Sequence, residues 1–302
     1  MIFGTALGSK IFNVEKFCNE EFGEEKTRQL IKKTGPKKLF ICGKNENTLS
    51  LSIKAWHDLK KKITLNLHDV ENIVYVTENP IRKFPGNGFY FASKMKIKNT
   101  TNIVDINSGC TGFVDALGLA LELKKGSIII CSEAYSKNIS RFTRSISTLF
   151  SDGAAAFVLN HNNMELINKS YGFLENTSND LSCEYNQDMS MNGKAVYDFT
   201  MTSVIPNLIS FVKKSKRTID RMYFHQGSKI VTKNFKTKLS KYCKHIPENI
   251  SLKGNLVSAT IPHLINDDLI KRPLKNEEII LLCGFGVGLA YSIILLKVKG
   301  KK

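Results

Sequence analysis

Short apolar runs alternate with amphipathic stretches through the first half of the chain. Residues 113–125 carry an apolar stripe at helical spacing, at positions 113, 117, 120 and 121. The apolar runs of strand length, typical of buried strands, are 72–76, 101–106, 127–131 and 155–159. Strands that alternate with helices predict a layered α/β protein.

The same alternation resumes in the second half. The elements predicted after a polar segment around 160–190 are a helix over 194–215, a strand over 221–225, a basic amphipathic helix over 228–244, and a closing pair of strands over 277–288 and 289–298. Pro206 either bends the first of these helices or begins a new one. Segments 149–160 and 281–296 each place small residues and glycines before an apolar strand, which is a weak internal similarity on its own.

Composition narrows the class of protein. The 302 residues are 42% hydrophobic, which is ample for a globular core. Residues 1–17 lack a basic segment that leads into an unbroken apolar one, and no stretch approaches the ~20 apolar residues of a membrane span. The seven cysteines are odd in number and scattered, without a C-x-x-C pair, so neither a disulfide framework nor a metal site is expected. The sequence therefore predicts a reduced, cytoplasmic protein without a membrane span.

The charge is strongly positive, with 44 Lys and Arg against 27 Asp and Glu, or +17. Such an excess suits nucleic acid, an acidic protein partner or a phosphate-bearing ligand, and composition does not decide among them. The basic residues are mostly lysine, without arginine interleaved with aromatic residues and without a recognisable nucleic-acid module. We therefore expect no nucleic-acid partner.

Candidate chemistry starts with Cys110, which lies between the strand at 101–106 and the helix at 113–125. A helix N-terminus favours a thiolate, although a single cysteine is more often a core residue. His225 ends a predicted strand, Asn255 follows a glycine before another helix, and 283–288 is a glycine-rich turn that can bring a backbone N–H close to a ligand. Together these groups suit covalent thioester chemistry, with a sulfur nucleophile and N–H groups for the oxyanion.

These segments, in this order, resemble beta-ketoacyl-acyl-carrier-protein synthase III, one of the thiolase-fold condensing enzymes. The matching stretches are DINSGCTGFVDAL around Cys110, LFSDGAAAFVL at 149–159 with Ser151 in place of a glycine, MNGKAVYDF at 191–199, HQGS at 225–228, GNLVSATIP at 254–262 and FGVG at 285–288. The resemblance implies a layered αβαβα arrangement of two similar α/β halves, which we expect at 1–165 and 166–302. The internal similarity then reflects the two halves.

The resemblance also implies roles. Cys110 would be the acylated nucleophile, and His225 and Asn255 would stabilise the thioester carbonyl and the carbanion formed when malonyl carrier protein loses CO₂. The backbone N–H groups of Cys110 and Val287 would form the oxyanion hole. Phe84 would reach the acyl pocket of the neighbouring subunit, which implies a homodimer. No metal and no permanently bound cofactor are implied.

The residues expected to contact coenzyme A or the pantetheine arm differ from the family pattern. Lys33, Thr34 and Gly35 stand where the family has Arg-Thr-Gly, without its nearby tryptophan, and Ser228 replaces an asparagine that contacts the pantetheine arm. The acyl donor therefore stays open between coenzyme A and a phosphopantetheine-bearing carrier protein. The lysines that would dock an acidic carrier protein are Lys229, Lys233, Lys236, Lys238 and Lys241, and a solvated helix face is the alternative.

These residues are compatible with three functions. The first is a decarboxylative Claisen condensation that gives a beta-ketoacyl thioester in fatty-acid or specialised acyl-chain synthesis. The second is an acyltransferase of the same fold that passes the acyl group to a hydroxyl or amine, and the third is a basic binding protein without a reactive thiol. Retention of both His225 and Asn255 favours the first. We interpret Asp152 as a turn residue, and Glu133 as either a pocket residue or a structural hydrogen-bond acceptor.

Overall fold

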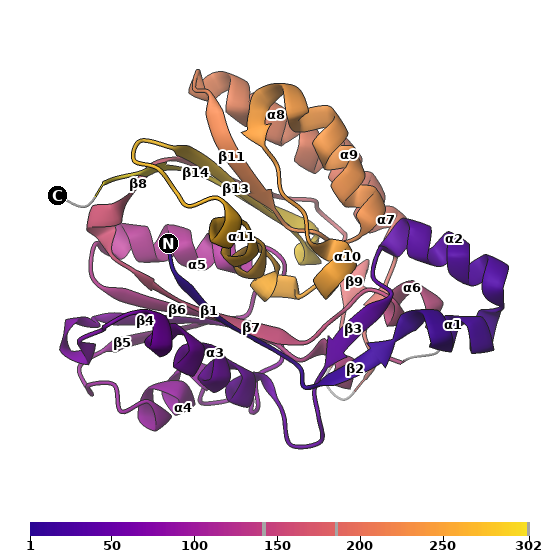
Figure 1. Cartoon of the computed structure of the whole chain (residues 1–302), viewed down its shortest axis with the longest axis horizontal. Coiled ribbons are helices and arrows are strands. Elements are labelled where there is room, and N and C mark those ends of the chain that lie inside the picture. The colour runs from indigo at the N-terminus through magenta and orange to yellow at the C-terminus, as the bar shows by residue number, and fades with distance from the viewer. Residues whose placement is uncertain (141–142, 185–186, 301–302) are drawn as a thin grey trace.

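Two mixed sheets, each of five strands, form the frame of the computed structural model, which describes residues 1–140, 143–184 and 187–300. Helices cover and separate the sheets, so that the layers run helix, sheet, helix, sheet, helix (Figure 1). The N-terminal sheet lies lower in that view, and the C-terminal sheet lies above it. The layering confirms the predicted αβαβα arrangement.

The N-terminal sheet has the strand order β1-β7-β6-β4-β5, with β6, β4 and β5 parallel and β7 antiparallel to both of its neighbours. The elements of this half are β1 (Phe3–Leu7), α3 (Thr48–Lys62), β4 (Asn72–Val76), α4 (Asn87–Lys94), β5 (Asn102–Ile106), α5 (Gly112–Leu123), β6 (Ser127–Glu133) and β7 (Gly153–Leu159). Helices α3 and α4 cover its outer face (Figure 1).

The C-terminal sheet repeats this pattern of pairing, in the order β8-β14-β13-β11-β12. Its elements are β8 (Met164–Phe173), α8 (Ile205–Ser215), β11 (Ile219–Phe224), α9 (Lys229–Leu239), β12 (Cys243–His245), α11 (Thr260–Lys271), β13 (Ile279–Gly286) and β14 (Ala290–Val298). The similar segments at 149–160 and 281–296 thus contain the matching strands β7 and β14. A division after residue 165 falls just inside β8 and stays a prediction.

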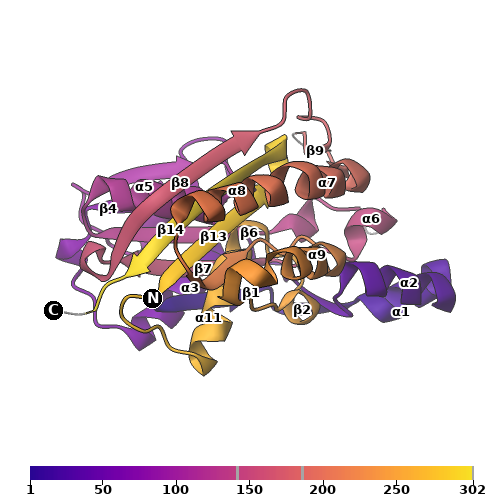
Figure 2. The ribbon, with the colours of Figure 1, turned by 90° about the horizontal axis from the view of Figure 1, so that it is seen from above.

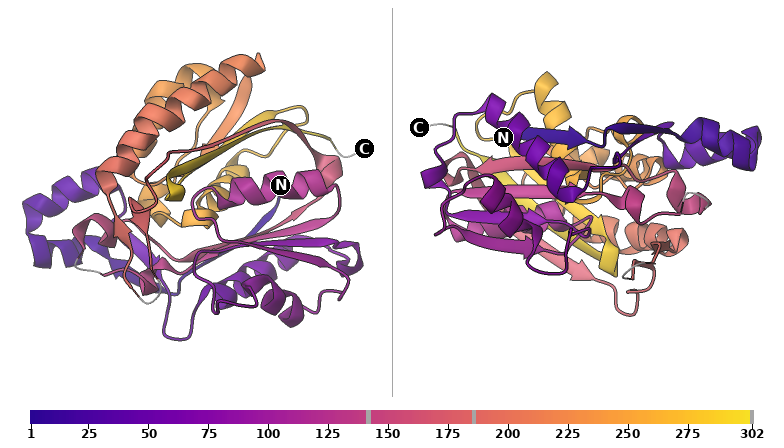
Figure 3. Two further views of the ribbon diagram at one scale, coloured as in Figure 1. Left: turned by 180° about the vertical axis from the view of Figure 1, so that it is seen from behind. Right: turned by 90° about the horizontal axis from the view of Figure 1, so that it is seen from below.

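Helices α5 and α11 lie between the sheets, as the view from behind also shows (Figure 3). The sequence predicts one apolar stripe on α5, but Val114, Ala116 and Gly118 are buried as well. A helix packed between two sheets needs an apolar surface on nearly all sides, and α5 supplies it. Because Cys110 lies just before α5, the most deeply packed helix of the first half aims its N-terminus at the site.

A smaller extension projects from the sheets beside α9 (Figure 2). It consists of β2 (Lys10–Asn13), α1 (Val14–Phe22), α2 (Glu24–Thr34) and β3 (Lys38–Ile41). Around the end of the C-terminal sheet lie the short elements α6 (Arg144–Ser147), β9 (Leu181–Ser182), β10 (Ser190–Met191), α7 (Gly193–Phe199) and α10 (Ile250–Lys253). Helix α2 contacts α9, so the extension reaches the functional end of the second half.

Two local predictions were wrong. The strand at 101–106 was expected to be buried, but β5 is the edge strand of its sheet and its side chains are exposed or half-buried. The basic helix was expected to run to residue 244, but α9 ends at Leu239 and Cys243 begins β12. Periodicity does not reveal which strand lies at an edge, and short strands after helices carry too few residues to show a period of two.

The predicted helix over 194–215 is continuous in the structure. It runs from α7 through a π-helical turn, Thr200–Val204, into α8. Pro206 lies just after this turn, and a proline inside a helix cannot donate a backbone hydrogen bond, so the departure from regular α-helical geometry lies where the proline disrupts it. Gly193–Ser215 has the length and composition that would allow a membrane crossing. Its apolar side chains Phe199, Leu208 and Phe211 instead pack in the cluster against the C-terminal sheet, as expected for an outer-layer helix of a folded domain.

Candidate active site

Cys110 lies in a tight turn between β5 and α5 and is 7% exposed. The turn closes through the Gly112 N–H, which donates to the Gly109 carbonyl at 2.9 Å. A Cβ atom on Gly112 would lie 2.4 Å from Cγ1 of Val76, and one on Gly284 would lie 2.6 Å from the Thr111 Cα. Glycine at both positions lets the turn sit between the two sheets, and this places the sulfur at their shared end.

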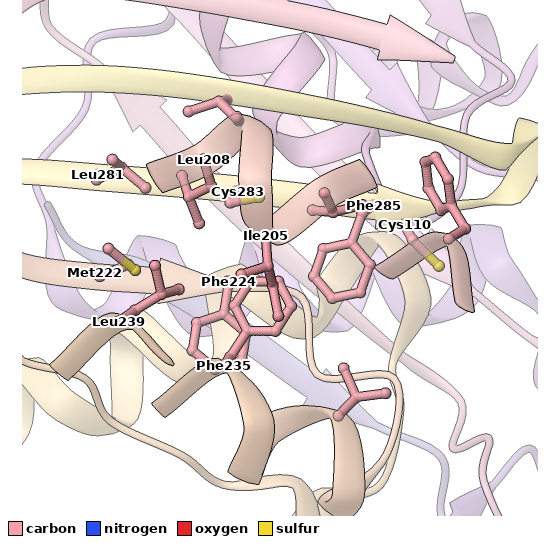
Figure 4. Packing of buried hydrophobic residues seen from close by; sticks show 14 of the residues in the cluster. Cys110, Ile205, Leu208, Met222, Phe224, Phe235, Leu239, Leu281, Cys283 and Phe285 are labelled. Atoms are coloured by element: carbon pink, nitrogen blue, oxygen red, sulfur yellow. The ribbon is translucent and has the colours of Figure 1, made fainter. Parts of the chain in front are cut away.

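His225 and Asn255 come to the same place from the second half. His225 follows β11, is 2% exposed, donates its backbone N–H to the Cys283 carbonyl at 2.8 Å, and packs edge-on against the Phe285 ring at 5.6 Å. Figure 4 shows Phe285 between Cys110 and the apolar cluster of the C-terminal half. The aromatic packing therefore fixes the imidazole beside the thiol-bearing turn.

Asn255 is held by its backbone and by one side of its carboxamide. Its N–H donates to the Leu149 carbonyl at 2.8 Å, and its Oδ1 accepts from the Val257 N–H at 2.8 Å. The side-chain hydrogen bonds of Asn255 within the described residues use Oδ1. Its Nδ2 group therefore remains available as a donor to a ligand.

All three predicted residues line one cavity of about 270 Å³. Most of its other lining residues are apolar, among them Leu149, Phe150, Leu181, Val196, Val231 and Phe285. Ligand sites commonly combine apolar walls with a few convergent polar groups. The cavity therefore suits an acyl group with its thioester directed at Cys110.

The turn after β13 presses its backbone against the thiol. The backbone N–H of Val287 is hydrogen-bonded to the Cys110 sulfur. A Cβ atom on Gly286, whose φ is 155°, would lie 2.7 Å from both Cβ and Sγ of Cys110. The predicted oxyanion donors, Cys110 and Val287, thus lie side by side only because position 286 has no side chain.

The Gly286→Ala variant should lose acylation of Cys110 by roughly a hundredfold or more, because the added methyl group overlaps the sulfur and displaces the Val287 N–H. Rates of acyl-enzyme formation by intact-protein mass would measure this loss. Gly193→Ala is the matched control, since Gly193 lines the same cavity but its added Cβ would approach only the Met191 Cε, at 3.8 Å. Wild-type acylation by Gly286→Ala would contradict the assigned oxyanion geometry.

The ionisation of the site is governed by burial. Burial, and next the charge of Glu78, raise the pKa of the Cys110 thiol, while the hydrogen bond from Val287 lowers it. Burial lowers the pKa of His225 from 6.5 to about 3, so the imidazole is neutral near neutral pH. The N-terminus of α5 was expected to favour the thiolate of Cys110. Burial and the charge of Glu78 oppose this effect, and the pKa of the thiol is raised overall.

Two groups beside Cys110 were not predicted from the sequence. Glu78 follows β4, and its carboxylate accepts a hydrogen bond from the Tyr135 hydroxyl; Tyr135 lines the cavity and its ring stacks on Phe150 at 5.3 Å. Glu78 and Tyr135 lie just after the parallel strands β4 and β6. Functional side chains of open α/β sheets gather at this end of the strands, so the position of the two residues could have indicated them. Glu133 is not a lining residue of this cavity: it accepts from the Ser258 Oγ at 2.6 Å and the Glu78 N–H at 3.1 Å.

The remaining predicted residues lie at the rim or outside. Lys33 and Ser228 line the cavity from α2 and from the N-cap of α9. Lys229 and Lys233 are exposed on α9, and the Lys236 Nζ pairs with Glu248 at 3.3 Å.

Phe84 is 82% exposed and does not line the cavity of its own chain. Asp152 is a turn residue as interpreted, since it accepts from the backbone N–H groups of Cys42 and Ser136.

The neutral buried histidines predict a pH dependence of stability. Burial lowers the pKa of His263, like that of His225, to about 3. A lowered pKa in the folded state means that stability is lost as the pH falls below the unfolded value of about 6.5, by roughly 1.4 kcal/mol per pH unit for each histidine. The pKa values of Glu78 and Glu133 are raised, so these two groups stabilise the folded protein as the pH falls. The contribution of one histidine is therefore measured by comparing wild type with a variant that lacks it.

Urea unfolding of wild type and His263→Gln between about pH 6 and 4 makes that comparison. The variant's free energy of unfolding should fall less steeply than that of wild type by about 1.4 kcal/mol per pH unit. His57→Gln, at an exposed position of α3, is the matched control and should keep the wild-type slope. Equal slopes for all three proteins would contradict the neutral buried state of His263.

Comparison with known proteins shows the family of the chain. A model of the family described as 3-oxoacyl-[acyl-carrier-protein (ACP)] synthase III matches residues 104–173, and the model of its C-terminal part matches residues 212–298. The beta-ketoacyl-[acyl-carrier-protein] synthase III 2 of Staphylococcus epidermidis is 30% identical and covers 97% of this chain and 96% of its own length. The chain belongs to the 3-oxoacyl-[acyl-carrier-protein] synthase III family. A Campylobacter jejuni beta-ketoacyl-[acyl-carrier-protein] synthase III is 29% identical over 90% of this chain and 89% of its own.

Solved structures of 3-oxoacyl-[acyl-carrier-protein] synthase III proteins share the fold. The Aquifex aeolicus protein has a TM-score of 0.87 at 21% identity and covers 98% of both chains. The Thermus thermophilus protein has a TM-score of 0.87 at 20% identity and covers 100% of this chain and 99% of its own. The thiolase-like fold predicted from the family resemblance is thus confirmed.

Proposed function

We propose that this protein is a condensing enzyme that joins an acyl group to malonyl carrier protein with loss of CO₂, giving a beta-ketoacyl thioester. The observation that carries the proposal is the convergence of Cys110, His225 and Asn255 on one apolar cavity, with the Val287 N–H on the sulfur. The names of the relatives support the same reaction. In reaction class this is an acyl transfer to carbon, and we assign it to fatty-acid or specialised acyl-chain synthesis.

The first half-reaction loads Cys110. Its sulfur attacks the carbonyl carbon of the acyl thioester, and the negative charge moves to the carbonyl oxygen. The N–H groups of Cys110 and Val287 stabilise that oxygen, and the collapse of the tetrahedral intermediate expels the donor thiol. The apolar walls exclude water from the acyl-enzyme and so protect it from hydrolysis.

The second half-reaction makes the carbon nucleophile. The carbonyl oxygen of the malonyl thioester accepts hydrogen bonds from the neutral imidazole N–H of His225 and from Nδ2 of Asn255. Loss of CO₂ places negative charge on that oxygen, where two buried donors stabilise it. The carbanion attacks the acyl carbonyl, and the Cys110 sulfur leaves. Transfer to a hydroxyl or amine would require a base and would give the two donors no such task, so condensation is the favoured reaction.

The substrates reach the site through a rim that carries Lys33 and Ser228. Either coenzyme A or the phosphopantetheine arm of a carrier protein fits this assignment as a thioester substrate, and no permanently bound cofactor is assigned. We assign the protein to the cytoplasm, in agreement with its seven free cysteines.

The active assembly in this proposal is a homodimer. The half-exposed edge strand β5 offers unpaired backbone groups that a second copy can pair with. Phe84, 82% exposed, is then positioned to enter the partner's acyl pocket. We further propose that the chain divides into two similar halves, 1–165 and 166–302.

The test of this function is intact-protein mass after incubation with a panel of acyl-coenzyme A and acyl carrier protein thioesters, followed by malonyl carrier protein. A covalent adduct that is discharged on addition of malonyl carrier protein, with release of CO₂ and formation of a beta-ketoacyl carrier protein, supports condensation. Discharge to a hydroxyl or amine without CO₂ would instead support the acyltransferase.

Carrier docking on α9 gives a separate prediction. The double variant Lys229→Glu/Lys233→Glu should raise KM for malonyl carrier protein by roughly tenfold with little change in kcat, because both exposed lysines flank the rim and attract an acidic partner. Lys213→Glu/Lys214→Glu, exposed in the last turn of α8, is the matched charge control. If both double variants change KM equally, net charge rather than docking on α9 is responsible.

A further inference from the structure

The residue after His225 is a buried glutamine that does not line the cavity. Gln226 is 0% exposed, and its carboxamide bonds to the backbone of segment 247–250. Its Oε1 accepts the N–H groups of Asn249, at 3.0 Å, and of Ile250, at 2.9 Å. Its Nε2 donates to the Pro247 carbonyl at 3.3 Å. One side chain next to His225 thus binds three backbone groups of a second segment.

That second segment leads directly to Asn255. Ile250 begins α10, and the last residue of α10, Lys253, is followed by Gly254 and then Asn255. Helix α10 has four residues and no side-chain hydrogen bond from its N-cap, and the Gly254 N–H donates to the Ile250 carbonyl at 2.9 Å. A movement of Ile250 is therefore passed through one helical turn to the neighbour of Asn255.

His225 and Asn255 are also anchored separately. The Asn255 N–H donates to the Leu149 carbonyl at 2.8 Å, which ties Asn255 to the first half of the chain. The His225 N–H donates to the Cys283 carbonyl at 2.8 Å, which ties His225 to the C-terminal sheet. These two bonds do not join the two segments to each other. The carboxamide of Gln226 does, at the level of the site.

Removal of the carboxamide would leave buried donors without an acceptor. Asn249 is 7% exposed and Ile250 is 2% exposed, so water does not reach their N–H groups in the present packing. A buried N–H without an acceptor is costly, and the segment would shift until its donors are satisfied. A misplacement of about 1 Å at catalytic groups can lower a rate by roughly a hundredfold.

We propose that Gln226 is a positioning residue of the second half-reaction, which holds the His225 segment against the Asn255 segment so that both donors reach one carbonyl oxygen. Two donors satisfy one oxygen only if each lies within hydrogen-bond distance of it at the same time. The inference rests on the condensation of the proposed function. The first half-reaction uses the N–H groups of Cys110 and Val287, to which Gln226 is not bonded, and should therefore be insensitive to it.

The experiment compares three variants of Gln226 with wild type. Gln226→Met removes the carboxamide at nearly the same side-chain length, and Gln226→Asn keeps a carboxamide that is one methylene too short. Gln226→Glu keeps an oxygen that can accept the two N–H groups. The matched control is Glu46→Met. Glu46 lies between β3 and α3, is 8% exposed, does not line the cavity, and accepts the N–H groups of Ser9 and Gly43 at 2.9 and 2.7 Å.

Two rates are measured for each protein: single-turnover acylation of Cys110 and CO₂ release from malonyl carrier protein. Gln226→Met and Gln226→Asn should acylate at close to the wild-type rate but release CO₂ roughly tenfold to a hundredfold more slowly. The loss should fall on kcat with KM little changed, because the donors act on charge that develops in the transition state. Gln226→Glu should recover most of the loss, and Glu46→Met should keep the wild-type ratio of the two rates.

A double variant separates positioning from general damage. In a His225→Ala background, Gln226→Met should change CO₂ release by less than about threefold, because the donor that it positions is already absent. A merely structural role predicts that Gln226→Met lowers the rate by the same factor in both backgrounds.

Normal CO₂ release by Gln226→Met or Gln226→Asn overturns the proposal. Equal losses of acylation and CO₂ release, or equal factors in the two backgrounds, overturn it as well. If wild type releases no CO₂ from malonyl carrier protein, the proposed function fails, and hydrogen exchange tests the contact separately. The Asn249 and Ile250 amides should then exchange faster in Gln226→Met than in wild type and Glu46→Met, and unchanged exchange would show that Gln226 does not hold the segment.

Discussion

The Cys110→Ala variant is expected to form no acyl-enzyme with any thioester and to lose condensation by roughly a thousandfold or more. The reason is that Cys110 provides the only thiol among the described residues that line the cavity, and the acyl-enzyme is a thioester of that thiol. Intact-protein mass after incubation with the acylating thioester measures the loss directly.

The control for this result is Cys183→Ala. Cys183 is exposed and is therefore the thiol most open to adventitious modification, so its variant should keep the wild-type adduct and rate. An adduct that persists in Cys110→Ala and disappears in Cys183→Ala would overturn the assigned nucleophile. Folding is checked by thermal unfolding, since a buried Cys→Ala change removes only one sulfur atom from the core.

Removal of either second-half donor is expected to separate the two half-reactions. Asn255→Asp and His225→Ala should still be acylated at Cys110, because the Cys110 and Val287 N–H groups remain in place. The decarboxylation of malonyl carrier protein should fall by roughly a hundredfold to a thousandfold, the usual loss when one preorganised donor is removed from an oxyanion site. Acylation by mass and CO₂ release from malonyl carrier protein give the two rates.

Asn255→Asp is the sharper of the two variants. The Oδ1 atom of Asn255 accepts the Val257 N–H at 2.8 Å, and an aspartate keeps that acceptor while it loses the Nδ2 donor and adds a charge that repels the developing carbanion. Thr260, whose hydroxyl reaches the same Oδ1 at 3.4 Å, supplies the control Thr260→Ser, which keeps the hydroxyl and should keep both rates. A variant Asn255→Asp that decarboxylates normally would remove Asn255 from the mechanism.

Much of the architecture was predictable because its signals are local. The strand at 72–76 coincides with β4, the helix at 113–125 with α5, and the closing strands with β13 and β14. Each of these elements is buried over most of its length, so its apolar residues follow the period of its own backbone. Cys110, His225 and Asn255 were also predictable, since each lies next to an element end and within a short stretch that resembles a motif of the family.

Other features depended on contacts between distant segments. The edge position of β5 was mispredicted because an edge strand and a central strand share the same propensities, and only pairing distinguishes them. Glu78 and Tyr135 were missed because 57 positions separate them, and neither has a neighbouring motif. Their partnership exists only because β4 and β6 are adjacent and parallel.

By itself, the sequence determined the αβαβα layering, the family and the three candidate site residues that the fold brings to one cavity, because these depend on residue type, local period and the order of short motifs. The tertiary structure alone decided how the thiol ionises. The pKa of Cys110 depends on burial and on the Glu78 carboxylate, and both result from the packing of two sheets against one helix. Burial and charge proximity are sums over neighbours in space, and no pattern along the chain contains those neighbours.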